Sequence, residues 1–180
     1  MPIDMKEQIA NSAWHLLLDK KAKRLTVKDI VEDCKITRQT FYYHFEDIPS
    51  LFRWIIERHG KSVLQESLAN GDAEQCLKTF FLLAINASPY VKQGMETNYR
   101  QELQQMLLEY CGLFFTELAE HEKIYPNCSR KETEFLVRYH SYAVIGVLHD
   151  WSEEDTKNLD EIVHRVWLLI KSAPAEDAAN

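Results

Sequence analysis

Apolar residues recur every three or four positions along most of the chain, which is the spacing of helices with one buried face. The clearest stripe lies near the C-terminus, at Leu159, Ile162, Val163, Val166 and Ile170. No stretch of useful length alternates apolar and polar residues as a half-buried strand would. The pattern therefore predicts an all-α protein.

Residues that favour helix N-caps begin four predicted helices in the first part of the chain. The second and third of these helices are short, and the second begins with a capping-box-like pair of threonine and aspartate. The fourth helix is long and is expected to stop at Asn70-Gly71, where a left-handed residue ends it. The four N-caps are Asp4, Thr26, Thr37 and Asp47.

Proline, glycine and further caps divide the remainder into four more predicted helices. They run from Asp72 to a break at Ser88-Pro89, from Thr97 to about Lys123, from a Ser129–Glu132 capping box to about Asp150, and from Ser152 or Asp155 to Pro174. The tail over 173–180 is small and polar, so we expect it to be disordered.

Composition supports long helices in a globular chain. The sequence has 5 glycines and 5 prolines in 180 residues, with 46% hydrophobic and 27% charged residues. Such a chain is not disordered overall, and its few helix breakers argue against a turn-rich β fold. Because it shows neither a membrane-length apolar run nor the apolar core of a signal peptide, we expect a cytoplasmic protein.

Charge is distributed unevenly along the chain. The net charge is −7, but residues 1–60 carry +1 and residues 61–180 carry −8. Within 20–38, seven basic residues outweigh three acidic ones. This asymmetry indicates a small anion-facing surface on an acidic body, although a solvated charged face would give the same pattern.

The short helices over 28–34 and 38–44, joined by the turn 35–37, have the layout of a helix-turn-helix. Phe41 and Phe45 are four residues apart, so both are expected to face the core. The surface left on the second helix has two tyrosines, a histidine and no acid, so nothing on it would repel DNA. The second helix of a helix-turn-helix lies in the major groove, where such side chains contact base edges and phosphates.

The segments Leu25-Thr26-Val27-Lys28-Asp29-Ile30-Val31 and Ile36-Thr37-Arg38-Gln39-Thr40-Phe41-Tyr42-Tyr43-His44-Phe45 resemble the DNA-binding domain of the TetR family of transcriptional regulators. The resemblance covers about residues 6–60, and 35–42 is similar to the branch containing dihydroxyacetone kinase operon regulators. It departs from the family pattern at Lys35, where most relatives have glycine in the turn, and at Ile48, where a phosphate-binding lysine is common.

The resemblance implies a helix-turn-helix DNA-binding domain over 1–47 and a helical regulatory and dimerisation domain over 48–173. Arg38 and Gln39 are the expected base readers, because arginine pairs with guanine and glutamine with adenine. The other implied DNA-binding residues are Thr26, Lys28, Thr40, Tyr42, Tyr43 and His44. Packing is the alternative for either tyrosine, and a helix cap is the alternative for His44.

The resemblance also implies a ligand cavity and a homodimer interface in the C-terminal domain. The candidates for the cavity are Trp54, Phe81, Tyr99, Met106, Tyr110 and Phe114, and ordinary core packing is the alternative for each. The candidates for the interface, on the last two helices, are Tyr139, Ala143, Gly146, Val147, Val163, Val166 and Ile170. Intrachain packing is the alternative there.

Other chemistry finds little support in the sequence. No nucleotide-binding or hydrolase motif is present, the seven histidines show no metal-ligand spacing, and we expect neither a cofactor nor an enzyme. The four cysteines form no Cys-x-x-Cys pair and are expected to be reduced, with a redox switch as the alternative.

We therefore expect a homodimeric repressor that binds an operator in double-stranded DNA and responds to a small-molecule effector. The alternative is a helix-turn-helix adaptor or activator controlled by a protein partner.

Overall fold

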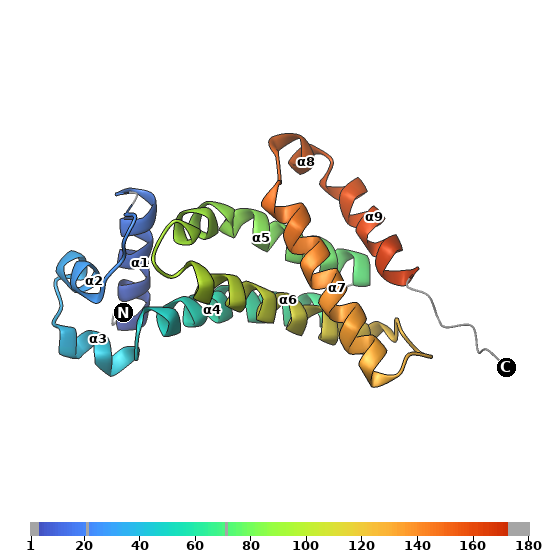
Figure 1. Cartoon of the computed structure of the whole chain (residues 1–180), viewed down its shortest axis with the longest axis horizontal. Helices are drawn as coiled ribbons and strands as arrows, with labels where there is room; N and C mark the ends of the chain where they lie inside the picture. The colour runs from blue at the N-terminus through green and yellow to red at the C-terminus, as the bar shows by residue number, and fades with distance from the viewer. Residues whose placement is uncertain (1–3, 21, 71, 173–180) are drawn as a thin grey trace. The chain divides into compact units, whose positions relative to one another are not determined.

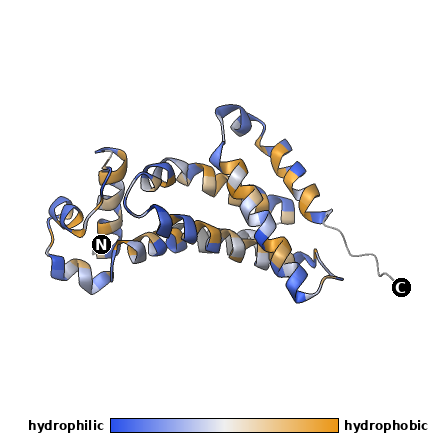
Figure 2. Cartoon of the chain, in the orientation of Figure 1, coloured by the Kyte–Doolittle hydropathy of each residue, from blue (hydrophilic) through white to orange (hydrophobic). Residues whose placement is uncertain are grey.

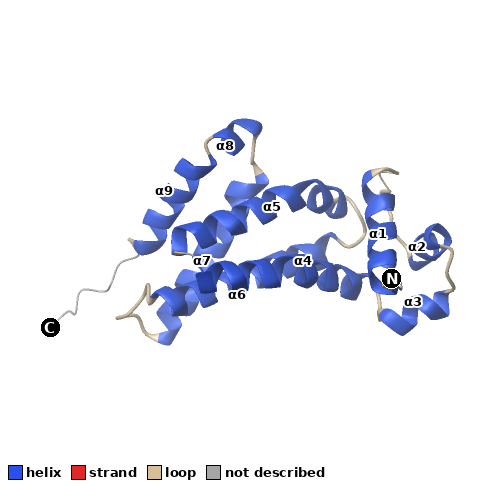
Figure 3. Cartoon of the chain, turned by 180° about the vertical axis from the view of Figure 1, so that it is seen from behind, coloured by secondary structure: helices blue, strands red, loops and turns tan. Residues whose placement is uncertain are grey.

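The computed structural model describes residues 4–20, 22–70 and 72–172, which form nine α-helices and no strand (Figure 1, Figure 3). The all-α prediction is therefore confirmed for the described residues. The expected helix stop at Gly71 and the expected disordered tail lie outside them. The helices are α1 Met5–Leu18, α2 Val27–Cys34, α3 Arg38–His44, α4 Ile48–Asn70, α5 Ala73–Met95, α6 Arg100–Glu122, α7 Arg130–His149, α8 Glu153–Lys157 and α9 Leu159–Lys171.

The chain divides into two compact units. The first contains the residues up to 61 together with 86–106, and the second contains 62–85 and the residues from 107 onward. Helices α4, α5 and α6 each contribute residues to both units. The functional division after residue 47 stays a prediction, because these units are defined by packing and not by activity.

The core of the first unit forms where α1, α2, α3 and the start of α4 bring their apolar faces together. Leu17 of α1, Ile30 of α2, Phe41 of α3 and Leu51 of α4 are all fully buried. Leu103 and Met106 of α6 are buried in the same cluster. Burial of large side chains stabilises this small unit, at roughly 1.5 to 3 kcal/mol for each one.

The core of the second unit is built by α5, α6, α7 and α9. Phe80 of α5 stacks on Phe114 of α6, with ring centroids 4.3 Å apart. Val144 of α7 and Val163 of α9 are buried in the same cluster. Helix α9 carries both hydrophobic and hydrophilic residues (Figure 2), and its buried residues Leu159, Val163, Trp167 and Ile170 recur every three or four positions, as a helix with one buried face requires.

Most of the predicted N-caps are confirmed in the structure, but α6 begins at Arg100 and not at the predicted Thr97. Thr26 and Asp29 form a reciprocal capping box at α2, and Ser129 and Glu132 form another at α7. The hydroxyl of Thr37 accepts a hydrogen bond from the backbone of α3. These caps supply partners for backbone N–H groups that the first turn of a helix leaves unpaired.

The predicted end of a helix at Ser88-Pro89 is wrong, because Pro89 lies inside α5. Proline removes one backbone donor and is unfavourable in a helix interior. Here the turns that follow it are held by packing. The ring centroids of Tyr90 and Trp14 of α1 lie 4.4 Å apart, and Leu103 lies so close to Gly94 that an added Cβ would be 2.7 Å from its Cδ1. Tertiary packing therefore outweighs the local preference.

The single helix predicted after Ser152 is in fact two helices. Ser152 and Asp155 form a capping box that begins the short α8. Asn158 ends it, because its side-chain amide donates to the carbonyl of Glu154 at 3.0 Å and its backbone departs from helical geometry. Helix α9 then begins at Leu159, which is buried.

None of the helices in the described residues is long and apolar enough to cross a membrane.

Candidate nucleic-acid interface

The turn between α2 and α3 sets the geometry of the candidate interface. Lys35 adopts the left-handed conformation, with φ 57° and ψ 42°, at the position where the family resemblance expects glycine. This costs a non-glycine residue about 1 kcal/mol or more. The backbone N–H of Ile36 donates to the carbonyl of Val31 at 3.0 Å, which closes the turn and directs α3 away from α2.

Helix α3 buries one face and exposes the other. Phe41 and Phe45 lie in the core, as their spacing predicts. Tyr43 is 85% exposed, and Tyr42 is also exposed, so neither tyrosine is a core residue in the described structure. The remaining predicted DNA-binding residues of α3 are all accessible: Arg38 and Gln39 are exposed, and Thr40 and His44 are partly exposed.

Two of these side chains have partners within α3 or its cap. The hydroxyl of Thr40 lies 2.9 Å from that of Thr37, and the ring of His44 lies 5.0 Å from that of Tyr43 in an edge-on arrangement. Both pairs remain at the surface, so the groups are held in place without being buried.

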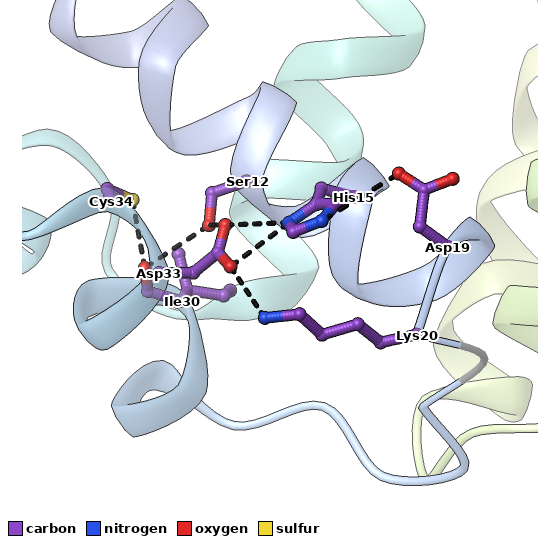
Figure 4. Close-up of polar contacts among 7 residues, drawn as sticks. All are labelled: Ser12, His15, Asp19, Lys20, Ile30, Asp33 and Cys34. Atoms are coloured by element: carbon purple, nitrogen blue, oxygen red, sulfur yellow. Dashed lines mark hydrogen bonds and ion pairs between the residues drawn. The ribbon is translucent and has the colours of Figure 1, made fainter.

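A cluster of polar side chains fixes α1 against the end of α2 (Figure 4). Asp33 of α2 accepts hydrogen bonds from the Ser12 hydroxyl at 2.8 Å and the Lys20 ammonium at 2.9 Å, and His15 Nδ1 lies 3.0 Å away. The Lys20 hydrogen bond, helped by His15 and Ser12, lowers the pKa of Asp33 to about 2 against the opposing effect of burial. The charge of Lys20 is therefore paired with the carboxylate of Asp33 within the first unit.

Other basic residues face solvent near the start of α2 and α3. Arg24, Lys28 and Arg38 are exposed, and among the described residues Lys28 makes only a long ion pair with Glu32, at 3.7 Å between two exposed side chains. Exposed ion pairs of this kind contribute little energy, so Lys28 can exchange Glu32 for a phosphate. Lys21, the remaining basic residue next to Lys20, lies outside the described residues.

These basic residues surround an open hollow of about 700 Å³. The predicted residues Thr26, Lys28, Arg38 and Tyr42 all line it, so the structure brings residues of α2 and α3 together. The complete lining is Arg24, Thr26, Val27, Lys28, Asp29, Arg38, Tyr42 and Tyr99. Sequence reasoning missed Arg24, whose signal was its place in the basic stretch before the Thr26 cap.

The six residues predicted to line a ligand cavity fall into two separate clusters. Trp54, Tyr99 and Met106 pack in or against the core of the first unit. Phe81, Tyr110 and Phe114 pack in or against the core of the second unit. The structure therefore does not gather the six into one cluster.

The residues predicted for a dimer interface also differ in exposure. Tyr139, Ala143, Gly146 and Val147 are all exposed on α7. The three candidates on α9 are less exposed than those on α7.

Val163 and Ile170 are each only 1% exposed and Val166 is half-buried, because this stripe packs into the core of the second unit. The prediction of Val163 and Ile170 as dimer-interface residues is corrected to its alternative, intrachain packing, and Val166 stays a prediction. The exposed apolar residues of α9 are instead Leu168 and Leu169.

Sequence reasoning also missed two exposed aromatic residues of α7. Phe135 and Tyr142 are both more than half exposed. They lie four residues before and three residues after Tyr139, on the same helical face. That spacing was the signal that could have found them.

Helix α7 also carries a buried polar residue, His140. Its Nε2 has no hydrogen-bond partner among the described residues, and the rings of Phe115 and Tyr125 lie 6.2 and 6.3 Å away. Burial lowers the pKa of His140 below its usual value, which keeps the ring neutral.

All four cysteines are free thiols. Burial raises the pKa of Cys34, Cys76 and Cys111, in the last case to about 12, so these three thiols stay protonated. No group of three or more His, Cys, Asp or Glu in the described part of the chain could hold a metal ion.

Comparison with known proteins identifies the architecture. In fold, the chain is similar to the dihydroxyacetone kinase operon activator DhaS, with a TM-score of 0.62 and 18% identity over 93% of this chain and 94% of that one. In sequence, it is 22% identical to the HTH-type transcriptional regulator YxbF of Bacillus subtilis (strain 168). That match covers 94% of this chain but only 46% of YxbF. The chain therefore spans about half the length of this relative.

The C-terminal part of the chain gives the family. Residues 71–172, more than half of the sequence, match the TetR-type transcriptional regulator C-terminal region. The N-terminal helix-turn-helix and the all-α fold agree with this match. The chain therefore belongs to the TetR family of transcriptional regulators.

Proposed function

We propose that the protein is a sequence-specific DNA-binding regulator whose recognition helix is α3. The observation that carries the proposal is the outer face of α3: Arg38, Gln39, Tyr42 and Tyr43 are all exposed, and the helix contains no acidic residue. A helix with this face fits the major groove, where arginine reads guanine and glutamine reads adenine. Thr26 and Lys28, at the start of α2, bind the DNA backbone.

The test uses DNA fragments that the wild-type protein selects from a random library. Arg38→Ala should weaken binding to the selected fragment by about 1 to 3 kcal/mol and relax the preference at one base pair of each half-site. Lys28→Ala should weaken binding to all sequences alike and reduce the salt slope by about one. If both variants bind the fragment like wild type, α3 is not the recognition helix.

The DNA-binding unit is small, so we propose that two copies act together as a homodimer through α7. Phe135, Tyr139, Tyr142 and Val147 expose a band of apolar surface along this helix, with Gly146 beside them. Soluble proteins seldom leave such a band uncovered. A twofold mate would cover it with the same face and set two recognition helices on half-sites about 34 to 36 Å apart.

For regulation we propose a small-molecule effector and a repressor role. The proposed effector site is reduced to the candidates of the second unit, where Phe81 and Phe114 are buried and Tyr110 is half-buried. Helix α4 links this unit covalently to the first. An effector that prefers one arrangement of the chain would shift the DNA-bound population by its difference in affinity, typically about 1 to 3 kcal/mol.

An activator controlled by a protein partner is the second candidate, and the name of DhaS, an operon activator of the same fold, favours its activating role. Transcription from a selected operator, measured with and without the protein, separates the two directions. Loss of transcripts supports a repressor, and gain of transcripts supports an activator.

A further inference from the structure

The hollow beside the recognition helix has one wall that does not come from the helix-turn-helix. Seven of its lining residues belong to 24–42, and the eighth, Tyr99, belongs to the segment between α5 and α6. This segment, 96–99, is called the α5–α6 turn below. It lies in the same compact unit as α1, α2 and α3.

The α5–α6 turn is held against the helix-turn-helix by a specific contact. The side-chain oxygen of Asn98 accepts a hydrogen bond from the backbone N–H of Leu25 at 3.3 Å, across 73 residues of sequence. Leu25 is fully buried and directly precedes Thr26, the N-cap of α2. The ring of Tyr99 packs edge-on against Phe52 of α4, with centroids 6.1 Å apart.

Internal contacts also give the turn a defined shape. The buried hydroxyl of Thr97 donates to the carbonyl of Gly94 at 2.6 Å and accepts from the backbone N–H of Tyr99 at 3.2 Å. A side chain at Gly94 would lie only 2.7 Å from Leu103, so glycine allows the two helices to approach here. Tyr99 is therefore placed by contacts on both sides of the turn.

The hollow carries a positive balance of charge. Arg24, Lys28 and Arg38 contribute three cations, and Asp29 contributes the single carboxylate. That carboxylate already accepts hydrogen bonds from the backbone N–H and the hydroxyl of Thr26, at 3.0 and 2.6 Å. A group bound in the hollow thus meets cations and a tyrosine side chain, which is the chemistry that holds a phosphate.

We propose that the α5–α6 turn is part of the DNA-binding surface, and that Tyr99 donates a hydrogen bond to an operator phosphate held by Arg24 and Arg38. The hollow is open to solvent and shares Arg38 and Tyr42 with the exposed face of α3, so a DNA strand is the occupant that fits it. Asn98 acts as a positioning residue, because it ties the turn to Leu25. This inference rests on the proposed function.

The α5–α6 turn is also linked covalently to the second unit. The turn joins α5 to α6, and both helices continue into the second unit. A shift of either helix would therefore move Tyr99 without first moving α4.

The experiment measures affinity for the selected double-stranded fragment by fluorescence anisotropy at several salt concentrations. Tyr99→Phe keeps the ring on Phe52 and removes only the hydroxyl, and should weaken binding about tenfold with an unchanged salt slope. Arg24→Ala should weaken binding and reduce the salt slope by about one. The matched control is Tyr90→Phe, which removes a hydroxyl from a tyrosine of the first unit that does not line the hollow and should bind like wild type.

Asn98→Ala tests the positioning role separately. It should weaken DNA binding and increase hydrogen exchange at the Leu25 amide, whereas Tyr99→Phe should leave that exchange unchanged.

The inference is overturned if Tyr99→Phe and Arg24→Ala bind like wild type while Arg38→Ala is impaired, a result that leaves the proposed function standing. It is also overturned if Tyr90→Phe loses as much affinity as Tyr99→Phe. If Arg38→Ala too binds like wild type, the proposed function fails and this inference fails with it.

Discussion

Replacing Asp33 with asparagine tests how α1 and α2 are held together in the first unit. The carboxylate is only 15% exposed and receives hydrogen bonds from Ser12 and Lys20, with His15 beside it. Asparagine has nearly the same shape and keeps an acceptor oxygen, but it carries no charge. The substitution therefore removes the charge and turns one of the two acceptor oxygens into an NH2 donor, so one of the hydrogen bonds from Ser12 or Lys20 is lost as well.

The magnitude follows from the pKa of Asp33, which is lowered from 3.8 to about 2, chiefly by Lys20. A depression of this size corresponds to roughly 2.5 kcal/mol of preference for the charged form. Lys20 is 54% exposed and His15 is 45% exposed, so solvent weakens their interactions with the carboxylate. We expect Asp33→Asn to lower the free energy of unfolding by about 1 kcal/mol at pH 7.

The pH dependence has a definite sign. Because the folded pKa of Asp33 lies below its ordinary value of 3.8, the unfolded chain binds more protons between that value and about 2. The stability that the carboxylate contributes is therefore fully present above about pH 4. It is lost as the pH falls toward 2, where wild type and Asp33→Asn should become equally stable.

Urea unfolding followed by circular dichroism, at pH 7 and at steps from pH 4 to 2.5, measures both effects. Hydrogen exchange in α2 localises the loss to the first unit. The matched control is Asp19→Asn, because Asp19 is 73% exposed and lies 3.8 Å from His15, so less than about 0.5 kcal/mol is expected. The reasoning is refuted if Asp33→Asn and Asp19→Asn lose the same stability, or if the deficit of Asp33→Asn is as large at pH 2.5 as at pH 7.

Two further predictions concern α7. Gly146→Glu should convert a dimer to monomers in sedimentation experiments without unfolding the chain, since an added Cβ would meet no atom of the described residues within 4 Å beyond its own stretch of helix. A dimer of unchanged strength would place the interface elsewhere. Wild type should lose stability as the pH falls below about 6.5, because burial lowers the pKa of His140 in the folded chain and the unfolded chain therefore binds the proton first. His140→Phe should remove this loss. Thermal melting from pH 8 to 5 measures this, and parallel profiles for the two proteins would contradict it.

Local interactions explain which features the sequence by itself determined. The capping boxes at Thr26 and Ser129 join residues three positions apart, so their composition was enough to place the starts of α2 and α7. The inward pair Phe41 and Phe45 was predictable in the same way, from a spacing of four residues. Helix α3 and its exposed face were predictable for this reason, because one turn and one helical period define them. The left-handed turn at Lys35 was expected only from the family resemblance.

Only the tertiary structure decided the features that depend on residues far apart in the chain. Periodicity marked the apolar stripe of α9, but it does not say whether such a stripe covers its own core or a partner, and packing placed Val163 and Ile170 inside. Pro89 stays within α5 although its local preference opposes a helix. The contact between Asn98 and Leu25, which brings the α5–α6 turn to the candidate interface, joins residues 73 positions apart, and no local pattern encodes such a pairing.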